Sequence, residues 1–272
     1  MLQPTDLILS HYCLAAAPAE RFEAAARAGF AGVALNWDEL KAVRTAEGSL
    51  SSIKAHLKDA GLAARQLEYL SLPAAGGEKA FDDEVRDAVD TAAELGCEVI
   101  LVLALDLSAS RARLVHGLGT LAACCGRSRI ACAVEFVPAV TAVPDLATAR
   151  RLLAEVASPA AGLLVDSLHF YRSGAPWEEL DALATDAVRV IQLNDGTPGP
   201  AGPDFAEEAL GRRLLPGDGA FDLRRFVDTL AHVAPAVPLT AEVINLELQR
   251  KYSAAALAQL IATRMRALLA YR

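Results

Sequence analysis

Residues 162–170 read GLLVDSLHF, an apolar run that ends in a carboxylate. The run is short and continuous, which is typical of a strand buried on both faces of a parallel sheet. Asp166 closes it, and His169 follows three residues later. A buried carboxylate is unfavourable unless it has a partner. The stretch therefore predicts a core strand that ends in a functional polar residue. It also predicts a turn of the chain at Ser167 that brings His169 back over that end.

The same unit recurs along the whole chain, because short apolar runs alternate with longer amphipathic segments. Start and stop signals support several helices: Asp145 precedes one, and Gly61 and Gly96 follow two others. The predicted strands are residues 6–11, 32–35, 65–70, 98–105, 131–137, 162–166, 188–194 and 238–243. The predicted helices are residues 18–28, 51–60, 81–95, 110–125, 145–157, 177–185, 222–232 and 253–270. Eight such pairs in 272 residues predict a single (β/α)8 barrel domain over residues 1–272.

An open, doubly wound sheet is the main alternative fold. That fold binds dinucleotides through a GxGxxG turn after its first strand. Here the first predicted strand is followed by AAAPAERF, which contains no glycine. The closed barrel is therefore the preferred fold class.

Composition excludes several classes of partner. The formal net charge of −8 and a pI near 5.2 argue against a surface that binds nucleic acid or anionic lipid. No apolar run approaches the roughly 20 residues that span a bilayer, and the first residues do not resemble a secretory leader. Five irregularly spaced cysteines indicate reduced thiols rather than a disulfide framework. We expect a cytoplasmic protein with no nucleic-acid or membrane partner.

Four successive predicted strands end in a polar residue. Strand alternation directs Glu135, Asp166, Gln192 and Glu242 toward the barrel axis, at the end where barrel enzymes carry their chemistry. A single carboxylate at such a place is ordinarily a helix cap or loop partner, but three carboxylates and one amide on four successive strands point to a shared site. Three neighbouring buried carboxylates call for a cation. Their oxygen ligands suit Mn²⁺ or Mg²⁺, with Co²⁺ and Zn²⁺ as alternatives.

The segments EFVP, VDSLHFYRSG, IQLNDG, RRLLPGDG and TAEV resemble those of the sugar phosphate isomerase/epimerase superfamily. These xylose isomerase-like barrels include ketose 3-epimerases, inosose dehydratases and endonuclease IV. The resemblance implies a divalent metal ion held by Glu135, Asp166, Gln192 and Glu242. Gln192 departs from the pattern, because many members have histidine there, and an amide is a weaker ligand than imidazole. Metal affinity and identity therefore stay open at this point.

The resemblance also implies roles for individual side chains. Glu135 and Glu242 would be both metal ligands and acid/base groups that pass a proton through an enediolate, with Asp166 a ligand only. His169 would contact the substrate by donating to a hydroxyl or a developing oxyanion. Arg213 would bind a hydroxyl, carboxylate or phosphate group of the substrate. The expected function is an isomerase or epimerase of carbohydrate metabolism, acting on a sugar or polyol-like substrate.

Three other functions remain as alternatives. The same chemistry with a leaving group gives a dehydratase of an inosose or a dehydroshikimate-like acid. If Gln192 weakens the site too far, the chain is a non-catalytic barrel that binds a small molecule. A DNA-repair nuclease is disfavoured, because five scattered histidines and a charge of −8 supply neither a zinc cluster nor a basic face. The sequence leaves open whether the chain forms a homo-oligomer.

The loop after the seventh predicted strand is unusually long. Residues 194–223 contain several proline and glycine residues and exceed the usual length of a strand-to-helix connection in a barrel. Loops of this kind often cover barrel mouths. We expect this segment to lie over the site, with LLPGDG as a tight turn.

Overall fold

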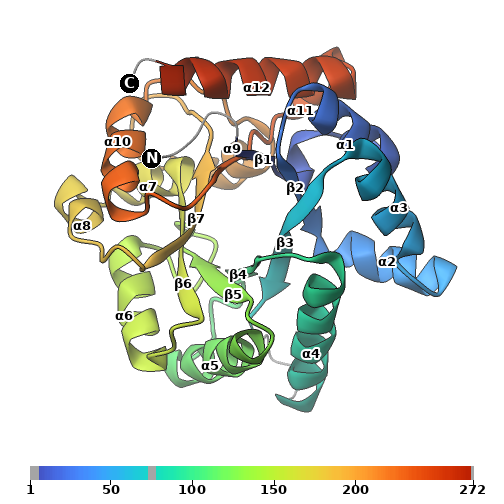
Figure 1. The fold of residues 1–272 in the computed structure, drawn as a ribbon. Helices are drawn as coiled ribbons and strands as arrows, with labels where there is room; N and C mark the ends of the chain where they lie inside the picture. The colour runs from blue at the N-terminus through green and yellow to red at the C-terminus, as the bar shows by residue number, and fades with distance from the viewer. Residues whose placement is uncertain (1–5, 73–77, 271–272) are drawn as a thin grey trace.

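Eight parallel strands close into a barrel in the computed structural model, which describes residues 6–72 and 78–270. Each strand pairs with the next in sequence order, and β1 pairs with β8 to complete the ring. Figure 1 shows the helices arranged around the strands. The strands are β1 (Leu7–Leu9), β2 (Gly32–Asn36), β3 (Ala63–Ser71), β4 (Val99–Leu103), β5 (Ala131–Glu135), β6 (Ala161–Asp166), β7 (Val188–Leu193) and β8 (Leu239–Ala241). The predicted (β/α)8 barrel is confirmed.

The helices include all eight predicted segments and several short elements that the periodicity missed. The unpredicted elements are the 3-10 helix η1 (His11–Cys13) and the α-helices α2 (Trp37–Glu47), α7 (Ser167–Ser173), α9 (Phe205–Gly211) and α11 (Leu246–Lys251). The predicted ones are α1 (Pro18–Arg27), α3 (Ser51–Ala60), α4 (Glu78–Leu95), α5 (Arg111–Arg127), α6 (Leu146–Val156), α8 (Trp177–Asp181), α10 (Leu223–Val233) and α12 (Ala254–Ala270). Four of the five missed elements have seven residues or fewer, too short for a helical period to show.

Side-chain caps explain where two of the missed helices begin. Asn36 accepts a hydrogen bond from the backbone N–H of Glu39 at the start of α2. Asp166 accepts from the N–H of His169 at the start of α7. An N-cap of this type stabilises a helix by about 1 kcal/mol. The strand ends at Asp166 and the chain turns at Ser167 as predicted, but the turn is the start of a helix: the chain passes directly from β6 into α7, and His169 lies in the first turn of that helix.

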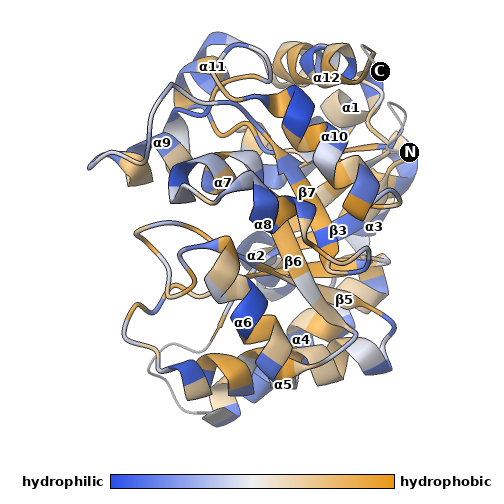
Figure 2. Cartoon of the chain, turned by 90° about the vertical axis from the view of Figure 1, so that its left-hand side faces the viewer, coloured by the Kyte–Doolittle hydropathy of each residue, from blue (hydrophilic) through white to orange (hydrophobic). Residues whose placement is uncertain are grey.

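The core has two layers. Inside the barrel, alternate residues of neighbouring strands pack together: Val99, Leu101, Ala133, Leu164 and Val190. Outside it, the other faces of the strands pack against the apolar sides of the helices. Figure 2 shows this division, with hydrophobic strands and helices that alternate hydrophobic and hydrophilic faces. Within the described ranges, no helix is both long and apolar enough to span a bilayer.

The long loop after β7 packs over the carboxyl end of the barrel. Phe205 and Ala209 of α9 form a buried cluster with Val137 and Leu168. Arg172 of α7 anchors the loop, because its Nε donates to Glu208 at 2.7 Å and it also donates to backbone carbonyls of the loop. The loop is thus held by α7, the helix that starts at the site.

The LLPGDG segment forms a tight turn around one buried carboxylate. Asp195 accepts hydrogen bonds from the backbone N–H groups of Gly217, Gly219 and Phe221 at 3.0–3.1 Å. A Cβ at Gly219 would lie 2.2 Å from that carboxylate, so the close approach requires glycine. This turn fixes the chain immediately after Arg213.

Candidate active site and metal centre

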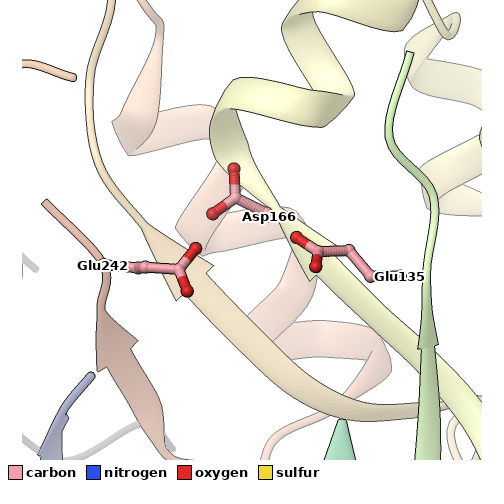
Figure 3. A group of neighbouring side chains, drawn as sticks. All are labelled: Glu135, Asp166 and Glu242. Atoms are coloured by element: carbon pink, nitrogen blue, oxygen red, sulfur yellow. The ribbon is translucent and has the colours of Figure 1, made fainter. Parts of the chain in front are cut away.

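Three buried carboxylates meet at the carboxyl end of the barrel. Glu135 ends β5, Asp166 ends β6, and Glu242 directly follows β8. One oxygen of each lies within 4.8 Å of the others. Figure 3 shows the three groups turned toward one another, with Asp166 between Glu135 and Glu242. All three residues are at most 2% exposed, so water screens their mutual repulsion little.

Fixed donors hold both oxygens of Glu242. Its Oε1 accepts a hydrogen bond from Oη of Tyr69 at 2.8 Å and one from Nε2 of Gln192 at 3.1 Å. Its Oε2 accepts from Nη1 of Arg213 at 2.7 Å. The side chain of Glu242 is therefore fixed by residues from β3, β7 and the loop that follows β7.

Asp166 is held in a similar way. Its Oδ2 accepts from Nδ2 of Asn194 at 2.8 Å and from Nη1 of Arg213 at 3.1 Å. Among the described residues, its Oδ1 accepts only from the backbone N–H of His169, at 3.2 Å. Nη1 of Arg213 thus bridges Asp166 and Glu242 from a side chain that is 5% exposed. One guanidinium neutralises part of the charge of the cluster.

Glu135 is the least satisfied member of the cluster. Nε2 of His169 lies 3.2 Å from Oε1 of Glu135. Yet neither that oxygen nor Nδ1 of His169 makes a hydrogen bond with any described residue. Phe205 packs its ring edge-on against the imidazole, with 5.9 Å between the ring centroids. The site therefore has one buried carboxylate oxygen and one buried ring nitrogen that no described residue satisfies by a hydrogen bond.

Burial shifts the protonation of all three carboxyls in the same direction. It raises the pKa of Glu135 to about 8, and Asp166 adds to that rise. It raises the pKa of Glu242 to about 7, although the charge of Arg213 opposes the shift. The pKa of Asp166 is also raised by burial, again against Arg213. The cluster therefore favours either a proton or a further cation.

The pKa values of the two basic groups beside the cluster shift in opposite directions. Burial lowers the pKa of His169 to about 4, so its imidazole is neutral near pH 7. Burial also opposes the charge of Arg213, but Glu242 and Asp166 outweigh it, and the pKa of the guanidinium lies above its ordinary value. Arg213 is therefore a permanent cation, and His169 is a neutral donor or acceptor.

Gln192 takes part in the site through Tyr69. Its Nε2 donates to Glu242 and lies 3.0 Å from Oη of Tyr69, while its Oε1 lies 3.4 Å from the same hydroxyl. In this orientation the amide presents a donor to Glu242. A half-turn of the amide about its last bond would exchange the two atoms and turn an oxygen toward the carboxylates.

The donor set fits a divalent cation. A carboxylate oxygen can accept two hydrogen bonds, so one free lone pair remains on Oδ1 of Asp166 and on Oε2 of Glu242. Oε1 of Glu135 has no hydrogen-bond partner among the described residues. Each of the three carboxyl groups thus offers at least one hard oxygen ligand, the type preferred by Mg²⁺ and Mn²⁺.

A fourth carboxyl lies behind this cluster. Glu68 is fully buried in β3, and its Oε2 accepts from Oγ of Ser10 at 3.1 Å and from the N–H of His11 at 3.3 Å. Ser10 also lies 3.5 Å from Oε1 of Glu242. Burial, followed by the charge of Glu242, raises the pKa of Glu68 well above its ordinary value. Glu68 is therefore a further buried carboxyl that favours its protonated form, next to the site.

The structure brings all six residues predicted for the site into one connected group: Glu135, Asp166, His169, Gln192, Arg213 and Glu242. Sequence reasoning missed two others. Asn194 could have been predicted, because it lies two residues after Gln192 and alternation along a strand puts the two side chains on the same face. For Tyr69 the sequence gives no such signal. The register between β3 and β4 shifts between Leu67 and Leu70, so regular alternation does not predict the direction of the Tyr69 side chain.

Comparisons with known proteins agree with this architecture. A profile described as xylose isomerase-like TIM barrel matches residues 22–264. No curated protein matches the sequence. A solved structure of an IolI protein with a bound zinc atom has a TM-score of 0.85 at 17% identity, with 98% of each chain covered.

Two further solved structures have the same fold. A xylose isomerase domain protein from Alicyclobacillus acidocaldarius has a TM-score of 0.79 at 22% identity, with 97% of this chain and 98% of that chain covered. D-allulose 3-epimerase from Methylomonas sp., solved with D-allulose, has a TM-score of 0.77 at 17% identity, with 98% and 96% covered. Identities this low establish the fold alone. The profile match over residues 22–264 shows that the chain belongs to the xylose isomerase-like TIM-barrel family.

Proposed function

We propose that this protein is a metal-dependent isomerase or epimerase that acts on a sugar or a polyol-like substrate. The observation that carries the proposal is the buried cluster of Glu135, Asp166 and Glu242, whose oxygens lie within 4.8 Å of one another. Two structural neighbours support the class of chemistry by their names, since one binds zinc and the other is an allulose epimerase.

Glu135, Asp166 and Glu242 would hold the metal, with Gln192 as a fourth ligand after rotation of its amide. Mn²⁺ or Mg²⁺ is the proposed ion because all these ligand atoms are oxygens, and Co²⁺ and Zn²⁺ rank behind them. When bound, a divalent ion supplies positive charge that polarises a carbonyl and the hydroxyl beside it.

Glu135 and Glu242 would carry the proton. One carboxylate removes the proton from the carbon that bears the hydroxyl, next to the carbonyl, which leaves an enediolate. The other carboxyl returns a proton to that carbon from the opposite face, which inverts it. If the proton goes to the neighbouring carbon instead, and the hydroxyl proton passes to the former carbonyl oxygen, the carbonyl moves by one carbon. Both carboxyls are buried at the carboxyl end of the barrel, where a proton can be exchanged with little competition from water.

His169 and Arg213 would bind and orient the substrate. Nδ1 of the neutral imidazole has no hydrogen-bond partner among the described residues, and in the tautomer protonated at Nδ1 it can donate to a substrate hydroxyl or to a developing oxyanion. Arg213 would bind a hydroxyl, carboxylate or phosphate group while it remains paired with Glu242. Phe205 and the loop that carries it exclude water from this side of the site.

Solvent isotope exchange in a panel of ketoses, an inosose and dehydroshikimate tests the proposal. With Mn²⁺ in D₂O, we expect one equivalent of bound metal and deuterium at the carbon beside the carbonyl of a ketose. Glu242→Gln should slow the exchange about 100-fold or more, since it removes an acid/base group. Glu247→Gln, an exposed change on α11, should leave the rate unchanged.

The same panel separates the alternatives. Loss of water from the inosose or from dehydroshikimate, without epimer formation, would assign the protein as a dehydratase. Absence of bound metal at saturating Mn²⁺ would overturn both enzyme functions and leave a barrel that binds a small molecule without turnover. Full activity in Glu242→Gln would refute the assigned proton transfer.

A further inference from the structure

Every side chain proposed to bind metal or substrate is buried. Each of the six is at most 4% exposed: Glu135, Asp166, His169, Gln192, Arg213 and Glu242. Contact with a sugar therefore requires that a covering segment move away from them. Helix α9 is such a segment, because it packs against both residues proposed to bind the substrate, His169 and Arg213.

The contacts of α9 are confined to the substrate side of the site. The ring of Phe205 packs edge-on against the imidazole of His169, with 5.9 Å between the ring centroids. The carbonyl of Ala209 accepts a hydrogen bond from Nε of Arg213 at 2.7 Å. Within the described ranges, α9 makes no hydrogen bond or ion pair with any of the four proposed metal ligands. The position of α9 thus sets the two substrate-binding side chains and not the metal ligands.

One arginine of α7 holds α9 in this position. Nε of Arg172 donates to Oε2 of Glu208 at 2.7 Å, and its Nη2 donates to Oε1 of the same carboxylate. Such forked pairs are the strongest that arginine makes with a carboxylate. The side chains of Arg172 and Glu208 are 2% and 14% exposed, so water screens the pair little. Figure 2 shows α9 beside α7.

The remaining donors of Arg172 fix the chain that leads into α9. Its Nη1 donates to the carbonyl of Gly199, and its Nη2 donates to the carbonyl of Thr197 at 3.0 Å. The guanidinium also lies over the ring of Phe221, 5.1 Å from the ring centroid. All three nitrogens of the guanidinium are therefore engaged. A lysine at this position could not make these bonds at once, because its single ammonium lacks the planar fork.

The same short helix carries His169 and the residue that holds its cover. Asp166 caps α7, His169 lies in its first turn, and Arg172 lies in its last. Residues three apart lie on the same side of a helix. Helix α7 therefore links the acidic cluster, the substrate-binding histidine and α9 through one rigid element.

We propose that Arg172 is a positioning residue for substrate binding. Its pair with Glu208 keeps α9 closed over His169 and Arg213, and α9 opens to admit the substrate. The inference rests on the proposed function, since it takes those two residues as the substrate-binding groups. Breaking the pair should loosen the substrate side of the site and leave the metal side as it is.

Carbethoxylation of His169 by diethyl pyrocarbonate measures the closure of α9 without any substrate. Peptide mass analysis of the full chain locates the modified ring, and the exposed His116 of α5 is the reference. Glu208→Gln keeps the size of the side chain but removes its charge. It should speed the modification of His169 about tenfold, the effect of losing one charged hydrogen-bond partner. Glu207→Gln, whose side chain is 77% exposed on the same helix, should leave the rate unchanged.

A thiol reagent separates local opening from general loosening of the barrel. Cys132 of β5 is fully buried away from α9. Its alkylation by iodoacetamide should be as slow in Glu208→Gln as in the unmodified protein. Faster alkylation of Cys132, in step with His169, would overturn the proposal, because the pair would then stabilise the whole fold.

Kinetics and metal titration test the positioning role. In Glu208→Gln we expect the KM for a ketose to rise about tenfold, with a smaller change in kcat, while the affinity for Mn²⁺ by calorimetry stays within about twofold. A purely structural role would reduce the active fraction, and so kcat, without changing KM. Arg172→Lys, which keeps the charge, should lie between the unmodified protein and Arg172→Gln in both KM and the rate of His169 modification.

Two further outcomes would overturn the proposal. His169 could be modified equally fast in Glu208→Gln and Glu207→Gln, or kcat could fall in Glu208→Gln while KM stays constant. Failure of the isomerase proposal has a different signature, namely no bound metal and no turnover in the unmodified protein. The modification of His169 would still report whether Arg172 keeps α9 closed.

Discussion

Oη of Tyr69 lies 2.8 Å from Oε1 of Glu242 and 3.0 Å from Nε2 of Gln192, so one phenol joins β3 to the ends of β7 and β8. Tyr69 thereby fixes the orientation of two proposed metal ligands at once. The contact lies on the inner side of the barrel, where hydrogen bonds are poorly screened.

Replacing Tyr69 by phenylalanine should weaken metal binding without unfolding the protein. The ring remains, but Glu242 and Gln192 lose the hydroxyl that orients them. Loss of such a supporting contact typically weakens metal binding 10- to 100-fold, and we expect about tenfold for Mn²⁺ by titration calorimetry. Tyr252→Phe, between α11 and α12, serves as the control. Equal affinity in the two variants would show that Tyr69 does not orient the ligands.

Arg213 should stabilise the metal-free protein. Replacing it by glutamine leaves Asp166 and Glu242 buried without their shared cation, and breaking such a pair costs about 3 kcal/mol. Urea unfolding in the presence of chelator measures the loss, and added Mn²⁺ should restore part of it. The neighbouring exposed Arg212→Gln should change stability much less, because water screens its ion pairs. Similar effects in the two variants would contradict this role.

Stability of the metal-free protein should fall as pH rises from 6.5 to 8. The pKa values of Glu135 and Glu242, about 8 and 7, lie above the ordinary 4.5, so the folded state keeps protons that the unfolded state releases. That stability is lost as pH rises through the folded pKa values. His169, whose pKa is lowered to about 4, has the opposite effect only below its ordinary 6.5.

Denaturant unfolding at several pH values measures this slope. We expect a loss on the order of 1–2 kcal/mol across the window. Glu135→Gln should flatten the slope, since the amide does not titrate, and saturating Mn²⁺ should reverse it by binding the ionised carboxylates. A flat or rising profile in the metal-free protein would rule out the raised pKa values.

Replacing Gln192 by histidine should change the choice of metal. Imidazole is a stronger ligand than an amide for Zn²⁺ and Co²⁺, so these ions should gain affinity relative to Mg²⁺. Competition between Zn²⁺ and Mg²⁺, followed by elemental analysis after dialysis, measures the ratio. We expect a shift of at least tenfold toward Zn²⁺. An unchanged ratio would mean that position 192 does not contact the metal.

Much of the barrel was predictable because the sequence patterns that mark its strands and helix ends involve only neighbouring residues. The run LLVD shows that a strand is buried and where it ends, and Asp145 and Gly61 mark helix boundaries through contacts within one turn. The convergence of Glu135, Asp166 and Glu242 followed from one further rule, that parallel strands of a barrel end at the same face.

The missed parts depend on contacts between distant segments. Helix α7 has seven residues and exists because the same Asp166 that faces the cluster also caps it. Tyr69 enters the site through an irregularity in β3, which no periodicity predicts. The directions of the Arg65 and Arg189 side chains are likewise not predictable from alternation, because the β2–β3 pairing skips Arg65 and the β6–β7 pairing skips Arg189.

The amino-acid sequence by itself determined the fold class, the positions of the strands and the identity of the carboxylates at their ends, because hydrophobic periodicity and strand polarity act over neighbouring residues. Only the tertiary structure decided what those carboxylates meet. It placed Arg213 between Asp166 and Glu242 and set Tyr69 against Gln192. It also left one oxygen of Glu135 without a hydrogen-bond partner in the part of the chain that the structure describes. Such pairings join residues far apart in the chain, and closure of the barrel is what brings them within reach.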